Sequence, residues 1–404
     1  MDNIAGSPVE GDNFFGRHAE VARQVEILAN DDILLLGPRR IGKTSLARAV
    51  MAALRAEGWL TIEINVASGI DERGFLDKLD AALAPEMASI VIKGRNVLSE
   101  ACTALSKRVK SIRIPVPGAG QLGIDFNDGA DEDWTKVACD LLQLISQTKR
   151  RWLIYVDELP ILLFNIIRKD PQTGVQRVRR FLDWFRNDVR ALPNSRQVRW
   201  LVSGSVGLDT LVQQHGMADT INSMRHTSLA PFKNEVAIAM LRKLAHRYQM
   251  ALTENDVQAI VDAVQWTQPY YLQATFNHLR DLIAAQANAS PASLIEHAVD
   301  KLAQPGCDND LHHWEQRLSL QLPLSEARHA GALLNLAARA ENLLAELEGR
   351  LPNASTDEAR QAFINLRDIL QRDAYWWADE SSGAKRYRFC LEPLRRWWLR
   401  RITL

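Results

Sequence analysis

The sequence predicts an α/β protein whose first half builds a parallel sheet and whose second half is mostly helical. In the first half, short apolar runs such as Ile33–Leu36 alternate with longer patterns of helical period. This alternation is typical of a parallel sheet covered by helices on both faces. From about Asn234 onward, strand-like runs disappear until close to the carboxyl end. We therefore expect a sheet domain followed by a helical part.

Four runs in the first half have the apolar content expected of strands, and a short fifth strand is expected just before Pro231. These strands are expected at residues 33–36, 60–66, 152–156, 200–202 and 226–229. The helical patterns between them fall at residues 43–55, 134–146 and 175–192. One insert interrupts this order. It spans residues 111–126 and has a glycine-rich turn at 117–120, which predicts a β-hairpin.

The second half predicts two helical groups. The first is a packed bundle with helices at 234–248, 254–264, 269–284 and 293–302. After a linker at Pro305–Gly306, the second group has helices at 311–320, 325–339 and 357–372, strands at 374–378 and 386–390, and a closing helix rich in Trp and Arg. This order suggests a winged-helix domain. The expected domains are residues 1–232, 233–304 and 305–404.

The composition is that of an ordinary globular protein. The 404 residues include 49 Lys and Arg and 49 Asp and Glu, so the whole chain has no charge bias toward nucleic acid. The cysteines, at positions 102, 139, 307 and 390, are too far apart for a metal or redox motif. There is no secretory signal pattern and no apolar run near the ~20 residues of a membrane span. We expect a cytoplasmic protein with reduced thiols and no membrane association.

The first expected strand leads into a phosphate-binding motif. Residues 37–44 read Gly-Pro-Arg-Arg-Ile-Gly-Lys-Thr, which matches GxxxxGK[ST] between a strand and a helix. The two glycines let backbone N–H groups surround phosphate oxygens, and the following helix adds its positive dipole end. Lys43 is expected to reach the β- and γ-phosphates of ATP, and the Thr44 hydroxyl to help hold Mg²⁺. The expected nucleotide-binding residues here are Gly37, Pro38, Arg39, Arg40, Ile41, Gly42, Lys43, Thr44 and Ser45.

An acidic pair follows the apolar run 152–156. Carboxylates at the end of a buried strand are expensive to desolvate unless they bind something. We expect Asp157 to orient the Mg²⁺ that Thr44 also holds, and Glu158 to polarise the attacking water as general base. The simpler interpretation is a helix N-cap, for which Asp is well suited.

Two serines follow the strand expected at 200–202. Ser203 or Ser205 could face the γ-phosphate as a polar sensor and so take part in catalysis. An equally good interpretation is a helix N-cap before Val206.

Three arginines admit several interpretations. Arg39 and Arg40 could contact phosphate, a neighbouring subunit or the Asp157 region, and at least one of them could face solvent. Arg225 could act in trans as an arginine finger if the protein forms rings or dimers.

Together these segments resemble the archaeal-type P-loop ATPases, a group allied to STAND regulatory NTPases and, more distantly, to AAA+ origin-recognition ATPases. Besides the phosphate-binding and acidic motifs, Phe14-Phe15-Gly-Arg-His-Ala-Glu looks like the hhGRxxE element of this group. Segments 201–208, 225–231 and 386–398 are similar to its sensor strand, its Arg-x-x-x-Leu-x-Pro segment and its winged-helix signature. The sequence departs from the group before Pro269-Tyr-Tyr-Leu, where Gln265 and Gln268 stand at positions that favour glycine.

The resemblance implies an ASCE-type P-loop NTPase sheet with strand order 5-1-4-3-2, a helical lid and a carboxy-terminal winged-helix domain. It also implies that Phe14 and Phe15 help hold the adenine and that Pro269 approaches the nucleotide. The implied activity is slow ATP hydrolysis that drives a conformational switch, in which nucleotide clamps the sheet domain against the lid. The expected partner is a protein, either an effector or further copies of the chain.

A second hypothesis is a DNA-engaging ATPase, such as a loader or a mobile-element or defence helper, that uses the winged helix and the hairpin. Basic clusters at 107–113, 177–190 and 395–401 could contact DNA phosphates, although basic helix faces are usually just solvated. A third hypothesis is a nucleotide-locked adaptor that hydrolyses ATP barely or not at all.

Overall fold

The computed structural model describes residues 1–92, 134–204, 207–286, 288–339, 357–381, 383 and 385–403. The chain divides into two compact units. We call them the sheet unit, which comprises Arg17–Leu36 and Lys43–Ser228, and the helical unit, which comprises Met1–Gly16, Gly37–Gly42 and Leu229–Leu404. The hairpin expected at 111–126 lies outside the described residues.

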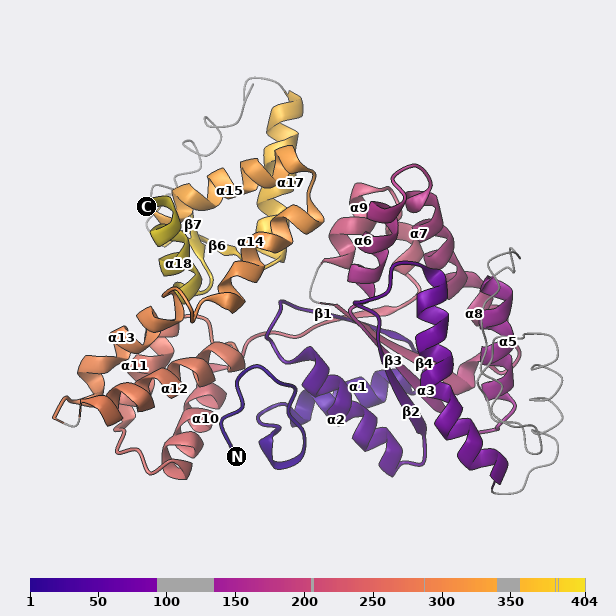
Figure 1. Ribbon diagram of the computed structural model, residues 1–404, viewed down its shortest axis with the longest axis horizontal. Helices are drawn as coiled ribbons and strands as arrows, with labels where there is room; N and C mark the ends of the chain where they lie inside the picture. Colours follow the sequence, from indigo (N-terminus) through magenta and orange to yellow (C-terminus); the bar gives the residue numbers. More distant parts are fainter. Residues whose placement is uncertain are drawn as a thin grey trace. The chain divides into compact units, whose positions relative to one another are not determined.

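The sheet unit is built on five parallel strands (Figure 1). Each begins within two residues of the expected position. The apolar runs of β1, β3 and β4 mark strands that are buried in the sheet, whereas β5 is mostly exposed. The order across the sheet is β2-β3-β4-β1-β5, which is the expected order read from the other edge, so this prediction is confirmed. The strands are β1 (Ile33–Leu36), β2 (Leu60–Asn65), β3 (Trp152–Asp157), β4 (Val198–Ser203) and β5 (Arg225–Ser228).

Helices connect these strands and pack on the sheet. α2 follows β1 and contacts β2, β3 and β4, whereas α3 contacts β2 and α6 contacts β4. α1 packs on α2, and α9 packs on α6. These helices are α1 (His18–Leu28), α2 (Lys43–Ala56), α3 (Glu72–Ile92), α5 (Trp134–Ser146), α6 (Leu159–Lys169) and α9 (Leu208–Gln214).

The helix expected at 175–192 is not a regular α-helix. α7 (Gly174–Asp183) continues into a π-helical turn at Trp184–Asp188 and then into α8 (Val189–Ala191). The Phe185 ring lies 4.9 Å from the ring of Trp200 in β4, and Trp184 and Phe185 are both buried. A π-turn inserts one residue into the helical repeat. The Trp184 ring also contacts Trp200, with ring centroids 6.3 Å apart, so both large rings of this turn pack against β4.

The helical unit contains the expected helices and a two-stranded antiparallel hairpin, β6–β7. Its apolar side chains form one continuous core that includes Trp314, Trp376 and Trp397. None of the helices within the described residues combines the length and apolar character needed to cross a membrane. The elements are α10 (Asn234–Arg247), α11 (Glu254–Val264), α12 (Pro269–Ala285), α13 (Pro291–Leu302), α14 (Asn309–Gln321), α15 (Leu324–Ala338), α17 (Asp357–Arg372), β6 (Trp376–Asp379), β7 (Arg386–Phe389) and α18 (Glu392–Thr403).

Candidate nucleotide site

The phosphate loop, residues 37–44, joins β1 to α2 as the motif requires. Gly37, Arg40 and Gly42 have positive φ angles of 144°, 68° and 99°. A Cβ at Gly37 would lie 3.1 Å from the carbonyl oxygen of Leu229, so this position has little room for a side chain. Arg40 adopts a conformation that residues other than glycine rarely take. The backbone therefore turns tightly where the glycines predict it.

Asp157, at the end of β3, accepts hydrogen bonds from two hydroxyl groups. Thr44 Oγ1 donates to Oδ2 at 3.0 Å, and Ser203 Oγ, at the end of β4, donates to Oδ1 at 2.7 Å. Asp157 is only 6% exposed and Ser203 is fully buried. The carboxyl edge of the sheet thus brings together three residues that the sequence placed in one site.

The oxygens of Thr44 and Asp157 suit a magnesium ion. Mg²⁺ prefers octahedral oxygen ligands at about 2.1 Å, which puts neighbouring ligands about 3 Å apart. The 3.0 Å between Thr44 Oγ1 and Asp157 Oδ2 matches this spacing. The donor set therefore fits the metal that the motif implies.

Glu158 turns the chain from β3 into α6. Its backbone lies in the left-handed region, with φ 62° and ψ 33°, and it occupies the N-cap position of α6 without a side-chain capping bond. Glu158 therefore holds the cap position without a capping bond from its side chain, and the Asp157 carboxylate binds Thr44 and Ser203 instead. Left-handed conformations of non-glycine residues cost about 1–3 kcal/mol and concentrate at functional sites.

Two further residues of this edge escaped the sequence analysis. Tyr155, buried in β3, has its hydroxyl 3.0 Å from Ser203 Oγ. Burial raises the pKa of Tyr155 well above its ordinary value, and the nearby Asp157 carboxylate adds to this effect. Tyr155 therefore stays protonated. Because the Ser203 hydroxyl gives its hydrogen to Asp157, the tyrosine is the donor to the serine. At Gly204 a Cβ would lie 2.3 Å from Pro160 Cδ, so only glycine fits beside the turn that carries Glu158.

Ser203 is not a helix cap, because α9 has Gly207 as its N-cap residue and Ser203 binds Asp157 instead. Ser205 lies outside the described residues. Arg225 starts β5 opposite Ile33, three residues before the strand's end at Ser228. At about 3.3 Å per residue it lies about 10 Å from the carboxyl edge of its own sheet.

Arg40 has partners that no sequence pattern indicated. Its Nε donates to Asp310 Oδ1 at 2.9 Å, in α14 of the helical unit, and a second nitrogen also binds that oxygen. Its guanidinium lies 4.6 Å from the ring centre of Tyr270, whose hydroxyl donates to Asp310 Oδ2. Burial and this hydrogen bond raise the pKa of Tyr270. A phosphate-loop arginine is thus held by the carboxy-terminal part of the chain.

The residues expected near the base belong to the helical unit. Phe14 and Phe15 are half-buried, and Lys243 Nζ lies 5.6 Å from the Phe15 ring centre. Pro269 is in the first turn of α12, directly after Gln268. Gln268 is fully buried, yet both polar atoms of its side-chain amide lack a hydrogen-bond partner. Sequence analysis noted Gln268 only as a departure from glycine, and its unpartnered amide is a tertiary feature that the sequence pattern does not indicate.

The other loop residues are placed as follows. Lys43 and Ser45 begin α2 and are buried, Ile41 is fully buried, and Pro38 and Arg39 are half-buried.

Comparisons with known proteins agree with this geometry. Among solved structures, a Walker-type ATPase of Pyrococcus abyssi has a TM-score of 0.62 and 16% identity and covers 99% of this chain and 100% of its own. The ORC2 protein of Aeropyrum pernix, in complexes with ADPNP and ADP, has a TM-score of 0.56 and 14% identity and covers 97% and 96%. At these identities the likeness shows a shared fold. A search of curated proteins found no match.

A protein-family model described as Novel STAND NTPase 1 matches residues 7–378. This match includes the phosphate loop, the acidic edge of the sheet and most of the helical unit. The chain therefore belongs to the Novel STAND NTPase 1 family of P-loop NTPases.

Proposed function

We propose that the chain is an ATP-binding and slowly ATP-hydrolysing switch that acts on a protein partner, either an effector or further copies of itself. The observation that carries this proposal is the hydrogen bond between Thr44 of the phosphate loop and Asp157, directly before Glu158, at the carboxyl edge of a parallel sheet. The adenine nucleotides bound to the ORC2 protein of Aeropyrum pernix support ATP as the ligand.

Each residue of this edge has a role in hydrolysis. The backbone N–H groups of the phosphate loop and Lys43 bind the phosphates. Thr44 and Asp157 would hold Mg²⁺, which when bound would supply positive charge to offset that of the phosphates. Glu158 orients the attacking water and accepts its proton. Ser203 fixes the Asp157 carboxylate from the side opposite Thr44 and so positions the metal ligand.

Arg40 couples the phosphate loop to the carboxy-terminal part of the chain. Its guanidinium binds Asp310, and a phosphate group in the loop is a competing anion for the same donors. ATP binding therefore weakens the link between Arg40 and Asp310, and loss of the γ-phosphate restores it. A ligand shifts a conformational equilibrium only by binding one state more tightly, and this competition supplies the difference.

The base is recognised in the helical unit. Phe14 and Phe15 supply apolar surface and Pro269 packs against the ring. The orphan amide of Gln268 supplies one donor and one acceptor, which complement the exocyclic amine and ring nitrogen of adenine. We interpret α14, α15, α17, β6–β7 and α18 as the winged-helix domain that receives the signal.

Nucleotide binding and turnover in single variants test the proposal. Lys43→Ala is expected to abolish ATP binding, whereas Glu158→Gln binds ATP normally and turns it over about 10²-fold more slowly or worse, because the general base is lost. Glu57→Gln, at an exposed position after α2, is the matched control and should behave like the unmodified chain. Undiminished ATP affinity in Lys43→Ala would remove the phosphate-loop assignment, and normal turnover in Glu158→Gln would place the base elsewhere.

The DNA-engaging alternative gains no support from the described residues. The clusters at 177–190 and 395–401 are largely neutralised by acidic side chains of the same unit, so they present less free positive charge than the sequence suggests. The cluster at 107–113 lies outside the described residues. The ion pairs are Arg177–Glu72, Arg179–Asp219, Arg186–Asp219, Arg395–Glu392, Arg396–Asp300 and Arg401–Glu315.

A further inference from the structure

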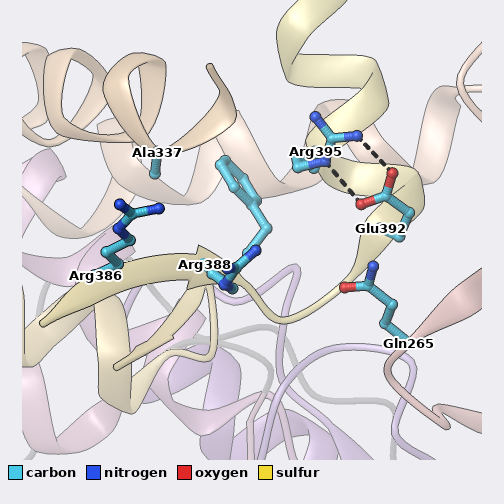
Figure 2. Close-up of a pocket in the computed structure, with 7 residues that line it drawn as sticks. Gln265, Ala337, Arg386, Arg388, Glu392 and Arg395 are labelled. Carbon is cyan, nitrogen blue, oxygen red and sulfur yellow. Dashed lines mark hydrogen bonds and ion pairs between the residues drawn. The ribbon is translucent and has the colours of Figure 1, made fainter. Parts of the chain in front are cut away.

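A separate cavity in the helical unit is lined by arginines. Its volume is about 260 Å³, and its walls come from the end of α11, from α15, from β7 and from the start of α18. Figure 2 shows Arg386 extending from β7 toward Ala337, with the Glu392–Arg395 pair and Gln265 across the cavity from it. None of these residues belongs to the phosphate loop or the acidic edge.

Most of the charge around this cavity is already paired. Arg395 donates two hydrogen bonds of 2.7 Å to Glu392, and Arg396 Nε donates a third at 3.0 Å. Although burial raises the pKa of Glu392, these bonds outweigh it and hold its pKa below the ordinary value. Glu392 is therefore ionised and compensated. Arg388 is bound to Asp379, at the end of β6.

Arg386 differs from the other arginines of the cavity. Its Nε is buried and has no hydrogen-bond partner, and no ion pair to its guanidinium occurs within the part of the chain that the structure describes. A buried guanidinium donor without an acceptor is unfavourable, because it has lost water and gained nothing in return. Arg386 lines the cavity, so an anion there would give its guanidinium the ion partner that it lacks among the described residues.

Gln265 faces this cavity from a strained turn. Its backbone has φ 63° and ψ −49°, and Trp266 N donates to Val264 O at 2.8 Å, which closes a γ-turn around it. The γ-turn with positive φ is rare and strained for any residue with a side chain, and glycine would take it more easily. The side-chain amide of Gln265 lines the cavity, so this strained position places a hydrogen-bond donor on the wall opposite Arg386 (Figure 2).

The remaining wall is apolar. The buried ring of Phe389 lines the cavity with the methyl group of Ala337. A charged donor, an amide and a flat apolar surface form the combination that small-molecule sites use, in which apolar contacts give affinity and a few polar groups fix orientation.

We propose that this cavity binds a small planar organic anion, whose phosphate or carboxylate group is held by Arg386 and whose apolar part packs on Phe389, while Gln265 offers a further hydrogen-bond donor from the opposite wall. The site lies in the carboxy-terminal part of the chain and gives the protein a second ligand, distinct from the nucleotide. It does not depend on the nucleotide proposal.

Calorimetric titration of the full chain with phenyl phosphate, benzoate and neutral phenol tests the site. All chains also carry Lys43→Ala, so that the phosphate loop does not add a second anion site. At least one of the two anions is expected to bind saturably and phenol is not, and the anion that binds identifies the group that is recognised. Arg386→Ala should weaken binding at least tenfold, the scale of one lost charge-assisted hydrogen bond. The control Arg328→Ala removes an exposed arginine of α15 and should change nothing.

Gln265→Gly separates a ligand role from a structural one. Glycine relieves the strained turn, so the thermal unfolding midpoint should not fall, while anion affinity drops severalfold. The proposal is overturned if neither anion binds saturably, if Arg386→Ala binds as tightly as the parent chain, or if duplex DNA displaces the anion through Arg386, which would assign this face to nucleic acid.

Discussion

Asp157 and Asp310 each bind a residue of the phosphate loop, but through different kinds of donor. Asp157 accepts hydrogen bonds from the hydroxyls of Thr44 and Ser203, whereas Asp310 accepts from the guanidinium of Arg40 and the hydroxyl of Tyr270. The two hydroxyl bonds bring no positive charge to Asp157, and their geometry suits a cation. The guanidinium neutralises Asp310 directly. One aspartate thus has surroundings that suit the metal we propose, whereas the other already has a cationic side chain as its partner.

Of the substitutions that test this difference between the two aspartates, replacing Asp157 by Asn should have the largest effect, which is on the rate of ATP turnover. Asn keeps the shape and still accepts from Thr44, but it lacks the charge that holds Mg²⁺. We expect turnover of ATP to fall by about 10²–10³-fold, the scale seen when one transition-state electrostatic contact is lost. The measurement is the ATPase rate over a range of Mg²⁺ concentrations, with the exposed Asp31→Asn as control. A variant that keeps its full rate at low Mg²⁺ would mean that Asp157 does not hold the metal.

The sheet and the cluster around Asp157 could be predicted from the sequence. Buried parallel strands are continuous apolar runs, so β1 and β3 stand out, and the candidate site residues lie at or directly after their carboxyl ends. Since the carboxyl ends of parallel strands meet at one edge, Thr44, Asp157 and Ser203 could be placed together without coordinates. The irregular end of α7 could not be predicted, because the rings of Trp184 and Phe185 pack against β4 only in the folded chain.

The pairing of Asp310 with Arg40 could not be predicted from the sequence. Arg40 and Asp310 are 270 residues apart, and neither forms part of a motif that specifies the other. The same holds for Gly204 and Gln268, whose importance depends on one close contact and one missing partner. Local patterns predict elements and motifs, whereas pairings between distant elements depend on tertiary packing.

Replacing Asp310 by Asn should have an effect of intermediate size. Unlike the Asp157 substitution, it should favour the nucleotide, by raising the affinity for ATP. Loss of the charged acceptor should lower the free energy of unfolding of the helical unit by about 1.5–3 kcal/mol. Because Arg40 is then free to bind phosphate, the apparent affinity for ATP should rise by up to roughly tenfold. Equilibrium unfolding and nucleotide titration measure the two effects, with Asp281→Asn, an exposed position on α12, as control. Weaker ATP binding in Asp310→Asn would contradict the competition between Asp310 and phosphate.

Replacing Ser203 by Ala should have the smallest effect. This variant tests whether Ser203 acts through Asp157 or contacts the γ-phosphate directly. The change removes the hydrogen bond to Asp157 and the acceptor for Tyr155, so we expect a stability loss of about 1–2 kcal/mol. Ser146→Ala, a buried serine that binds only a backbone carbonyl in α5, should lose less. If Ser203 acts through Asp157, the Mg²⁺ concentration for half-maximal turnover rises while the rate at saturating Mg²⁺ changes little. A rate at saturating Mg²⁺ that falls tenfold or more, with unchanged Mg²⁺ dependence, would instead make Ser203 a direct contact of the γ-phosphate.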